Sequence, residues 1–174
     1  MKGVILDSIR DLVVDKFGEE RWKEVLRRAD LPVTTVFPVT GNVPDETVLK
    51  IIGSICDVFN LTSKEVAEAF GEYWVTVYMP KVYKPYYRGI NTARDFLLKM
   101  DEIHRKVTEN ISDAHPPRFD YKWKDRNTLI MKYKSQRGLI DIFIGLINGV
   151  GKFYETPLDV NKISDNEVEI TFLE

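Results

Sequence analysis

The sequence predicts an α+β fold, in which a mostly helical first part is followed by an antiparallel sheet that one helix interrupts. Apolar residues recur at three- and four-residue spacing through most of the chain before Arg118, which is the period of an amphipathic helix. From Arg118 the pattern changes to alternation, which is typical of a half-buried strand, and helical spacing returns from Gly138 to Tyr154. Alternating stretches at Leu158 to Ile163 and Glu167 to Phe172 then predict a closing hairpin.

Composition favours a single soluble domain over residues 1–174. The chain is 44% hydrophobic and 30% charged, and its net charge of -2 offers no electrostatic case for nucleic acid. No apolar run approaches the roughly 20 residues of a membrane span, and the start lacks a signal-peptide pattern. A single cysteine, Cys56, excludes an internal disulfide and a cysteine-rich metal site. We therefore expect a cytoplasmic protein that does not insert into a membrane.

Four helices are expected in the first part: Val4 to Phe17, Glu20 to Ala29, Asp45 to Phe59, and one from Thr62 to about Val77. Asp45 is expected as an N-cap, and Asn60 as the left-handed residue that ends the third helix. Thr62-Ser-Lys-Glu65 has the pattern of a capping box. The stretch from Tyr78 to Gly89 holds four tyrosines and two prolines, which suggests a loop folded against the body.

The next helix carries a histidine. Asp95 to His104 has helical periodicity, and His104 follows Met100 by four residues, so both side chains are expected on the inward side. A histidine in such a place is more often a core residue that hydrogen-bonds to backbone. His115, the other histidine, precedes two prolines near the surface and is taken as incidental.

A second polar group lies on the strand expected from Leu129 to Arg137. Tyr133, Ser135 and Arg137 would share one face of it, because side chains at every second position of a strand point the same way. Two hydroxyls and a guanidinium form a good clamp for carboxylates. An inward imidazole opposite such a clamp suits a flat, apolar, dianionic metal cofactor. We therefore predict haem, with His104 as the axial iron ligand.

The same residues carry a family resemblance. His104, Pro117 thirteen residues later, and Tyr133-x-Ser135-x-Arg137 together resemble the signature of the H-NOX family, the haem domains that bind nitric oxide or oxygen. The similarity extends to three further stretches: Met1-Lys-Gly3, Phe70-Gly-Glu-Tyr-Trp74, and Gly145-Leu-Ile-Asn-Gly-Val-Gly-Lys152. It covers essentially the whole chain, which looks like a stand-alone bacterial member.

The resemblance implies haem b (iron protoporphyrin IX), buried between the helical part and the sheet. It implies that Tyr133, Ser135 and Arg137 hold the propionates. Pro117, aided by Ile5 and Leu146, would distort the porphyrin. Leu97 and Met100, in the helix that carries His104, are also expected to contact the cofactor.

Gas selectivity is expected to depend on the distal wall. Family members that hold oxygen have a tyrosine five residues after the clamp arginine, a position that Ile142 occupies here. Ile5, Ile9 and Leu146 would make the rest of the wall apolar, which favours nitric oxide and carbon monoxide and rejects oxygen. Trp74 and Tyr78 are expected to face the same pocket, where they either pack or donate a hydrogen bond; with such a donor the protein would bind oxygen instead.

The resulting hypothesis is a non-enzymatic nitric oxide sensor, in which release of His104 relaxes the helix that bears it. The signal would pass to a separate protein, for which the resemblance implies a histidine kinase or a cyclic-di-nucleotide enzyme. Two other classes are weighed against it. One is an enzyme that uses His104 as a general base beside Asp101, three residues earlier. The other is a haem-free peptide-binding domain.

Overall fold

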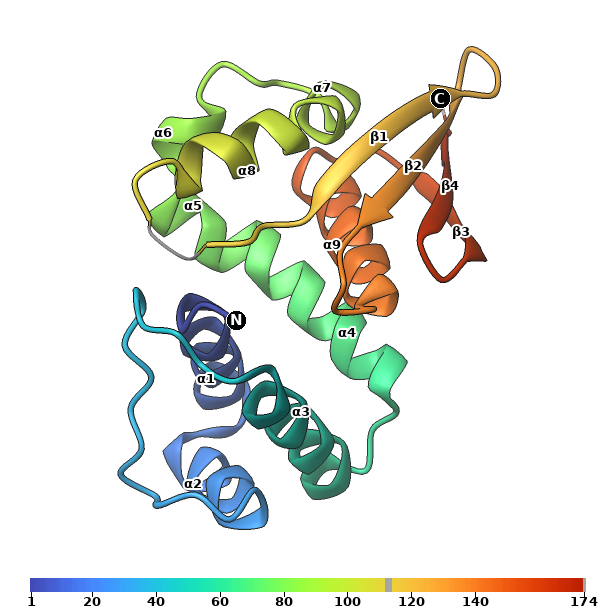
Figure 1. Ribbon diagram of the computed structural model, residues 1–174. Helices are drawn as coiled ribbons and strands as arrows, with labels where there is room; N and C mark the ends of the chain where they lie inside the picture. Colours follow the sequence, from blue (N-terminus) through green and yellow to red (C-terminus); the bar gives the residue numbers. More distant parts are fainter. Residues whose placement is uncertain (112–113, 174) are drawn as a thin grey trace. The chain divides into compact units, whose positions relative to one another are not determined.

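The computed structural model describes residues 1–111 and 114–173. It divides into two compact units, Met1–Val66 and Ala67–Glu174. Helices make up the first part, and a four-stranded antiparallel sheet with one inserted helix makes up the last, so the predicted α+β class is confirmed (Figure 1). The burial of haem between helices and sheet stays a prediction, as does the single domain over residues 1–174.

The first unit is built from three helices: α1 (Val4–Phe17), α2 (Glu19–Arg28) and α3 (Asp45–Phe59). α2 packs against both α1 and α3, and each helix buries the apolar side expected from its periodicity. Asn60 ends α3 in the left-handed conformation (φ 54°, ψ 47°), as predicted. The predicted N-cap is wrong by one residue, because Pro44 occupies that position. Asp45 starts the helix and binds the amino terminus of Met1 at 2.7 Å.

A long helical segment follows. α4 (Ser63–Tyr73) begins at the predicted capping box, in which the Thr62 amide donates to the Glu65 carboxylate (2.8 Å) and the Glu65 amide donates to the Thr62 hydroxyl (3.2 Å). It continues into a π-helical turn, η1 (Trp74–Tyr78), where the Met79 amide donates to the Trp74 carbonyl. The single α-helix expected up to Val77 therefore changes its winding at Trp74.

The tyrosine- and proline-rich stretch forms two short helices, α5 (Met79–Val82) and α6 (Lys84–Tyr87), where a loop was expected. Pro80 and Pro85 lie in the first turns of these helices. A proline is tolerated there because the amide hydrogen that it lacks would have no helical partner. The prolines in this stretch thus start helices.

The helix that carries His104 is also divided. α7 (Ala93–Leu98) begins at Thr92, whose hydroxyl accepts from the Asp95 amide, and α8 (Met100–Thr108) follows after Lys99. In an unbroken α-helix the Asp101 amide would donate to the Leu97 carbonyl. Here it donates to the hydroxyl of Tyr121, at 3.1 Å. A side chain from a strand therefore replaces one helical hydrogen bond at the point where the helix breaks.

The sheet has the strand order β1-β2-β4-β3 and contains β1 (Arg118–Trp123), β2 (Thr128–Lys134), β3 (Leu158–Ser164) and β4 (Glu167–Phe172). α9 (Ile140–Phe153) is inserted between β2 and β3. Its buried side and the inner face of β2 and β4 form one core, which includes Met131, Phe143 and Ile147. The backbones of α4 and α9 approach closely, because Gly71 and Gly145 face each other without side chains between them.

One element of the predicted clamp differs from expectation. β2 ends at Lys134, so Ser135 and Arg137 lie beyond the strand, and their alternation with Tyr133 on one strand face is wrong. The chain turns there through Gly138, which has a φ of 62°. Over residues 1–111 and 114–173, no helix has the length and apolar character that crossing a bilayer requires.

Candidate functional site

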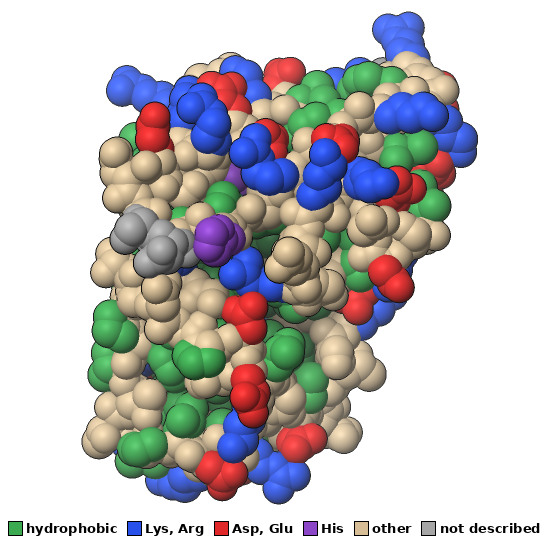
Figure 2. All heavy atoms as spheres, in the orientation of Figure 1, with side chains coloured by type: hydrophobic (Ala, Val, Ile, Leu, Met, Phe, Trp, Pro, Cys, Tyr) green, Lys and Arg blue, Asp and Glu red, His purple; other side chains and the backbone are tan. Residues whose placement is uncertain are grey.

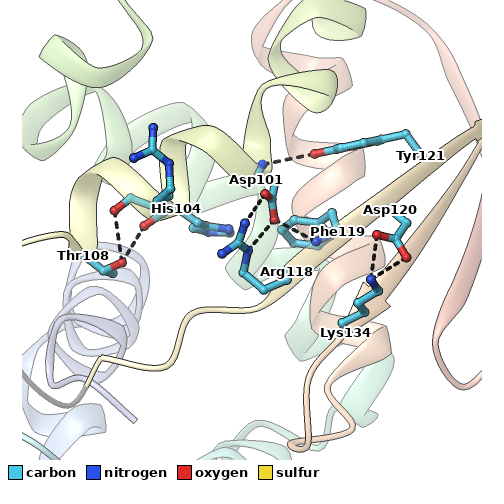
Figure 3. A network of polar contacts seen from close by, with 9 residues as sticks. Asp101, His104, Thr108, Arg118, Phe119, Asp120, Tyr121 and Lys134 are labelled. Atoms are coloured by element: carbon cyan, nitrogen blue, oxygen red, sulfur yellow. Dashed lines mark hydrogen bonds and ion pairs between the residues drawn. The ribbon is translucent and has the colours of Figure 1, made fainter.

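His104 projects from α8 toward β1, where its imidazole stacks on Phe119 with a centroid distance of 5.5 Å and an interplanar angle of 25° (Figure 3). The side chain as a whole is half-buried. Its Nδ1 atom, however, is fully buried and has no hydrogen-bond partner among the described residues. Leaving a buried ring nitrogen without a partner costs free energy of folding. We therefore infer that this nitrogen interacts with a ligand or a proton acceptor that the described side chains do not provide.

The protonation state of His104 agrees with metal binding. Burial lowers its pKa from 6.5 to about 4, and the opposing effect of the nearby Asp101 carboxylate is smaller. The imidazole is therefore neutral at neutral pH. Only the neutral ring has the lone pair that a metal ion needs.

A series of stacked rings extends from the histidine into the core. Phe119 stacks on Phe143 (5.1 Å, 26°), and Phe143 stacks on Tyr133 (5.3 Å, 19°). These rings come from β1, α9 and β2. Packed aromatic rings hold one another in defined orientations. The helix with the imidazole and the strand with the first clamp residue are thus connected through side chains that cannot turn independently.

The structure brings the three predicted clamp residues together, although only Tyr133 lies on the strand. Ser135 hydrogen-bonds the Tyr133 hydroxyl, and Arg137 is near enough for its positive charge to act on Tyr133. Burial raises the pKa of Tyr133, against the lowering effects of Ser135 and Arg137. The Arg137 amide donates to the Ser135 hydroxyl (3.3 Å), and its guanidinium donates to the His115 carbonyl (3.0 Å). Two hydroxyls and one guanidinium therefore gather where the chain leaves β2.

The predicted apolar contacts fall into two groups. Met100, Pro117 and Leu146 are half-buried, and Met100 and Leu146 pack against the edge of the core. Leu97 is only 2% exposed and lies inside that core. The half-buried set leaves apolar surface to water, as is expected of side chains that contact a cofactor.

The predicted distal residues lie on three helices. Ile142 is half-buried on α9. Trp74 and Tyr78 both lie on η1, and their rings stack at 5.2 Å with an interplanar angle of 18°. Ile5 and Ile9 lie in the first unit on α1, where Ile9 is buried and Ile5 half-buried.

Sequence reasoning missed the hydrogen-bond network around Asp101. Its carboxylate accepts from Arg118 (2.5 and 2.7 Å) and from the Phe119 amide (3.0 Å). Arg118 and the Phe119 amide lower the pKa of Asp101, Arg118 most strongly. No periodicity links a first-turn aspartate to an arginine on a strand seventeen residues later. Because both carboxylate oxygens already accept hydrogen bonds, the structure gives little support to Asp101 as a partner of His104 in acid–base catalysis.

These residues fit a haem. No group of three or more His, Cys, Asp or Glu side chains that could hold a metal ion exists within the described ranges. A metal bound by His104 would therefore have to bring its other ligands with it, as haem iron brings the porphyrin nitrogens. His104 would provide the axial nitrogen, and Tyr133, Ser135 and Arg137 would provide donors for the propionates.

Comparison with known proteins identifies the family of the chain. A family model described as "Haem-NO-binding" matches residues 2–162. The soluble guanylate cyclase gcy-35 of Caenorhabditis elegans is 24% identical over 174 residues, which cover 97% of this chain and 25% of the relative. Soluble guanylate cyclase gcy-34 of the same organism is 27% identical over 156 residues, or 87% of this chain and 23% of the relative. The chain thus spans about a quarter of the length of these curated relatives.

Solved structures show the same fold. A Cs H-NOX variant that carries 4-cyano-L-phenylalanine superposes with a TM-score of 0.89 at 24% identity, covering 100% of this chain and 97% of that one. An oxygen-binding H-NOX domain related to soluble guanylate cyclases superposes with a TM-score of 0.84 at 25% identity, covering 100% and 96%.

Proposed function

The chain belongs to the haem-NO-binding family of H-NOX domains, and on this premise we propose that residues 1–174 act as one haem-based gas sensor. It binds nitric oxide and carbon monoxide at ferrous haem and excludes oxygen. The cofactor is haem b. When bound, it would supply the iron that binds a diatomic gas.

The observation that carries the proposal is the state of His104. Its ring is neutral at neutral pH, its Nδ1 is buried without a partner among the described residues, and Phe119 holds it by stacking. A helix fixes the direction of its side chain. These properties are the ones that a rigid axial ligand on a dry surface requires.

The residues around the turn after β2 would hold the acid groups of the cofactor. Tyr133, Ser135 and Arg137 offer hydroxyl and guanidinium donors, and each charge-assisted bond sheltered from water contributes about 1.5–3 kcal/mol. Pro117, Leu146 and Met100, which are half-buried, would contact the porphyrin. These contacts, like those of Ile5 and Leu97, are inferred from the family resemblance.

Gas selectivity follows from the side chains that face the gas. The side chain of Ile142 has no hydrogen-bond donor, so bound oxygen would gain no stabilisation from it. That Ile9 also contributes to this wall stays an expectation from the sequence. The alternative is an oxygen-binding protein that uses Trp74 or Tyr78 as the donor. It is supported by the place of both residues on the π-helical turn η1, a kind of turn frequent at functional sites, and by the likeness to an oxygen-binding H-NOX domain.

The chain is proposed to act in the cytoplasm as a sensor without catalytic activity of its own. Its signal passes to a separate protein, a histidine kinase or a cyclic-di-nucleotide signalling enzyme, as the resemblance to bacterial members implies. The cyclase names of the curated relatives support a link to nucleotide signalling. A two-state element that a ligand biases is the general requirement for such an output.

The test is a visible absorption spectrum of the reduced protein in air, under nitric oxide and under carbon monoxide. The proposal expects haem spectra that change with both gases, and no stable oxygen complex. His104→Gly should lose haem, and added imidazole should restore it. A protein that stays colourless after incubation with haem would overturn the haem assignment, and a stable oxygen complex would favour the alternative.

A further inference from the structure

The first turn of α8 is fastened to β1 by four residues, Asp101, Arg118, Phe119 and Tyr121, which we call the edge clamp (Figure 3). The Asp101 carboxylate accepts two hydrogen bonds from Arg118 and one from the Phe119 amide. In the other direction, the Asp101 amide donates to the Tyr121 hydroxyl. Asp101 therefore exchanges hydrogen bonds with three positions of one strand, through both its side chain and its backbone.

The edge clamp differs from the other ion pairs on this side of the molecule. Figure 2 shows Lys and Arg side chains interleaved with carboxylates over the region of α8 and β1. The pairs Glu102–Lys106 and Asp120–Lys134 there are exposed. Glu102–Lys106, for example, lies within α8 and leaves each side chain 49% exposed. Such pairs contribute little to stability. Asp101 is only 26% exposed and satisfies a backbone amide as well.

The amide that Asp101 accepts from lies at the free edge of the sheet. Among the described residues β1 pairs with β2 alone, so one side of β1 has no strand partner there. Edge amides of this kind need water or another acceptor. By accepting from Phe119, Asp101 satisfies this edge amide and fastens α8 to β1.

Phe119 links the edge clamp to the imidazole. Its amide donates to Asp101, and its ring stacks on His104, one helical turn later. Residues three apart on a helix lie on the same side, so both contacts hold the same side of α8 against β1. Phe119 is also the register partner of Tyr133 in β2. A shift of α8 would thus act on the strand that carries the first propionate-clamp residue.

We propose that Asp101 is a positioning residue for His104: through the edge clamp it sets the direction in which the imidazole is presented. The proposal rests on the proposed function, in which His104 is the haem ligand. Asp101 itself touches neither the cofactor nor the gas in this scheme.

The test compares Asp101→Ala and Asp101→Asn with Glu102→Gln as the matched control. The Glu102→Gln substitution removes a carboxylate from the same turn, and that carboxylate pairs with Lys106 within α8. In the haem-free proteins, hydrogen exchange of the Phe119 amide should accelerate about tenfold or more in Asp101→Ala and stay unchanged in Glu102→Gln. Asp101→Asn keeps an acceptor for that amide but removes the charge that pairs with Arg118. It replaces the alanine variant in the measurements if that variant fails to fold.

In the reduced, haem-loaded proteins, resonance Raman spectroscopy reports the iron–histidine stretching frequency directly. Asp101→Ala and Asp101→Asn should shift or broaden this band, and Glu102→Gln should not. If the wild type shows the band and both Asp101 variants reproduce it, the positioning role is refuted while the sensor function stands. If the wild type takes up no haem, the proposed function fails and the positioning role fails with it.

Discussion

The contact between α4 and α9 makes a quantitative prediction about stability. A Cβ atom added to Gly71 would lie 2.0 Å from the carbonyl carbon and 2.2 Å from the carbonyl oxygen of Gly145, whereas ordinary contacts begin at 3.4 Å. The two helices would have to separate by roughly the difference, about 1.4 Å. Backbone atoms cannot give way as a flexible side chain can. We therefore expect Gly71→Ala to be clearly destabilising.

The expected size follows from two opposing effects. Overpacking a well-packed interior costs up to about 3 kcal/mol, and replacing glycine by alanine within a helix gains about 1 kcal/mol. The net loss of about 2 kcal/mol should lower Tm by about 4–8 °C for a chain of this size. Thermal unfolding followed by circular dichroism measures it.

Gly53→Ala is the matched control, because Gly53 lies within α3 and an added Cβ would meet nothing within 4 Å. It should be neutral or stabilise the protein by up to about 1 kcal/mol. A Gly71→Ala protein with the Tm of the wild type would refute the reasoning, since it would show that α4 and α9 do not pack backbone to backbone.

Three further predictions concern the site and its surroundings. Arg137→Ala should lower haem retention, measured as haem lost to apomyoglobin, without changing the far-ultraviolet circular dichroism; equal retention would argue against a propionate contact. Ile142→Tyr should raise oxygen affinity, seen as a longer-lived oxygen complex after reduction in air, whereas an unchanged lifetime would mean that this side chain does not face the gas. Burial raises the pKa of Tyr154 to about 12, helped by Tyr87 and Asp95. Because the folded state holds this proton more tightly than the unfolded chain, with its pKa of about 10, the stabilisation is present below pH 10 and is lost as the pH rises from about 10 to 12. Alkaline unfolding of Tyr154→Phe, compared with the wild type, should lack this contribution.

Sequence rules for helix caps and turns correctly predicted the features that depend on neighbouring residues. The capping box at Thr62, the left-handed Asn60 and the closing hairpin all depend on residues within a few positions of one another, and the structure has them as expected. His104 was found because a helix places it four residues after Met100. These features need no knowledge of the tertiary fold.

The elements that sequence reasoning missed have distant causes. The break between α7 and α8 depends on the hydroxyl of Tyr121, which comes from another element. The edge clamp joins Asp101 to Arg118 across seventeen residues, a separation that neither helical nor strand periodicity links. The gathering of Tyr133, Ser135 and Arg137 was predicted for the wrong reason, since a turn and not a continuous strand brings them together.

The π-helical turn η1 has a consequence for sequence length. A π-turn uses one residue more than an α-turn, so each later side chain is rotated by about 100° around the helix axis compared with an uninterrupted α-helix. Phe70 and Tyr73 are buried before this turn, Tyr78 is buried at its last position and Met79 directly after it, while Val77 is only half-buried. The extra residue thus changes which side of the helix the following side chains occupy. Deleting Val77 would remove the extra residue and turn the Tyr78 phenol away from Trp74, on which it stacks. A gap at this point in a homologue would therefore indicate a different packing of these two rings.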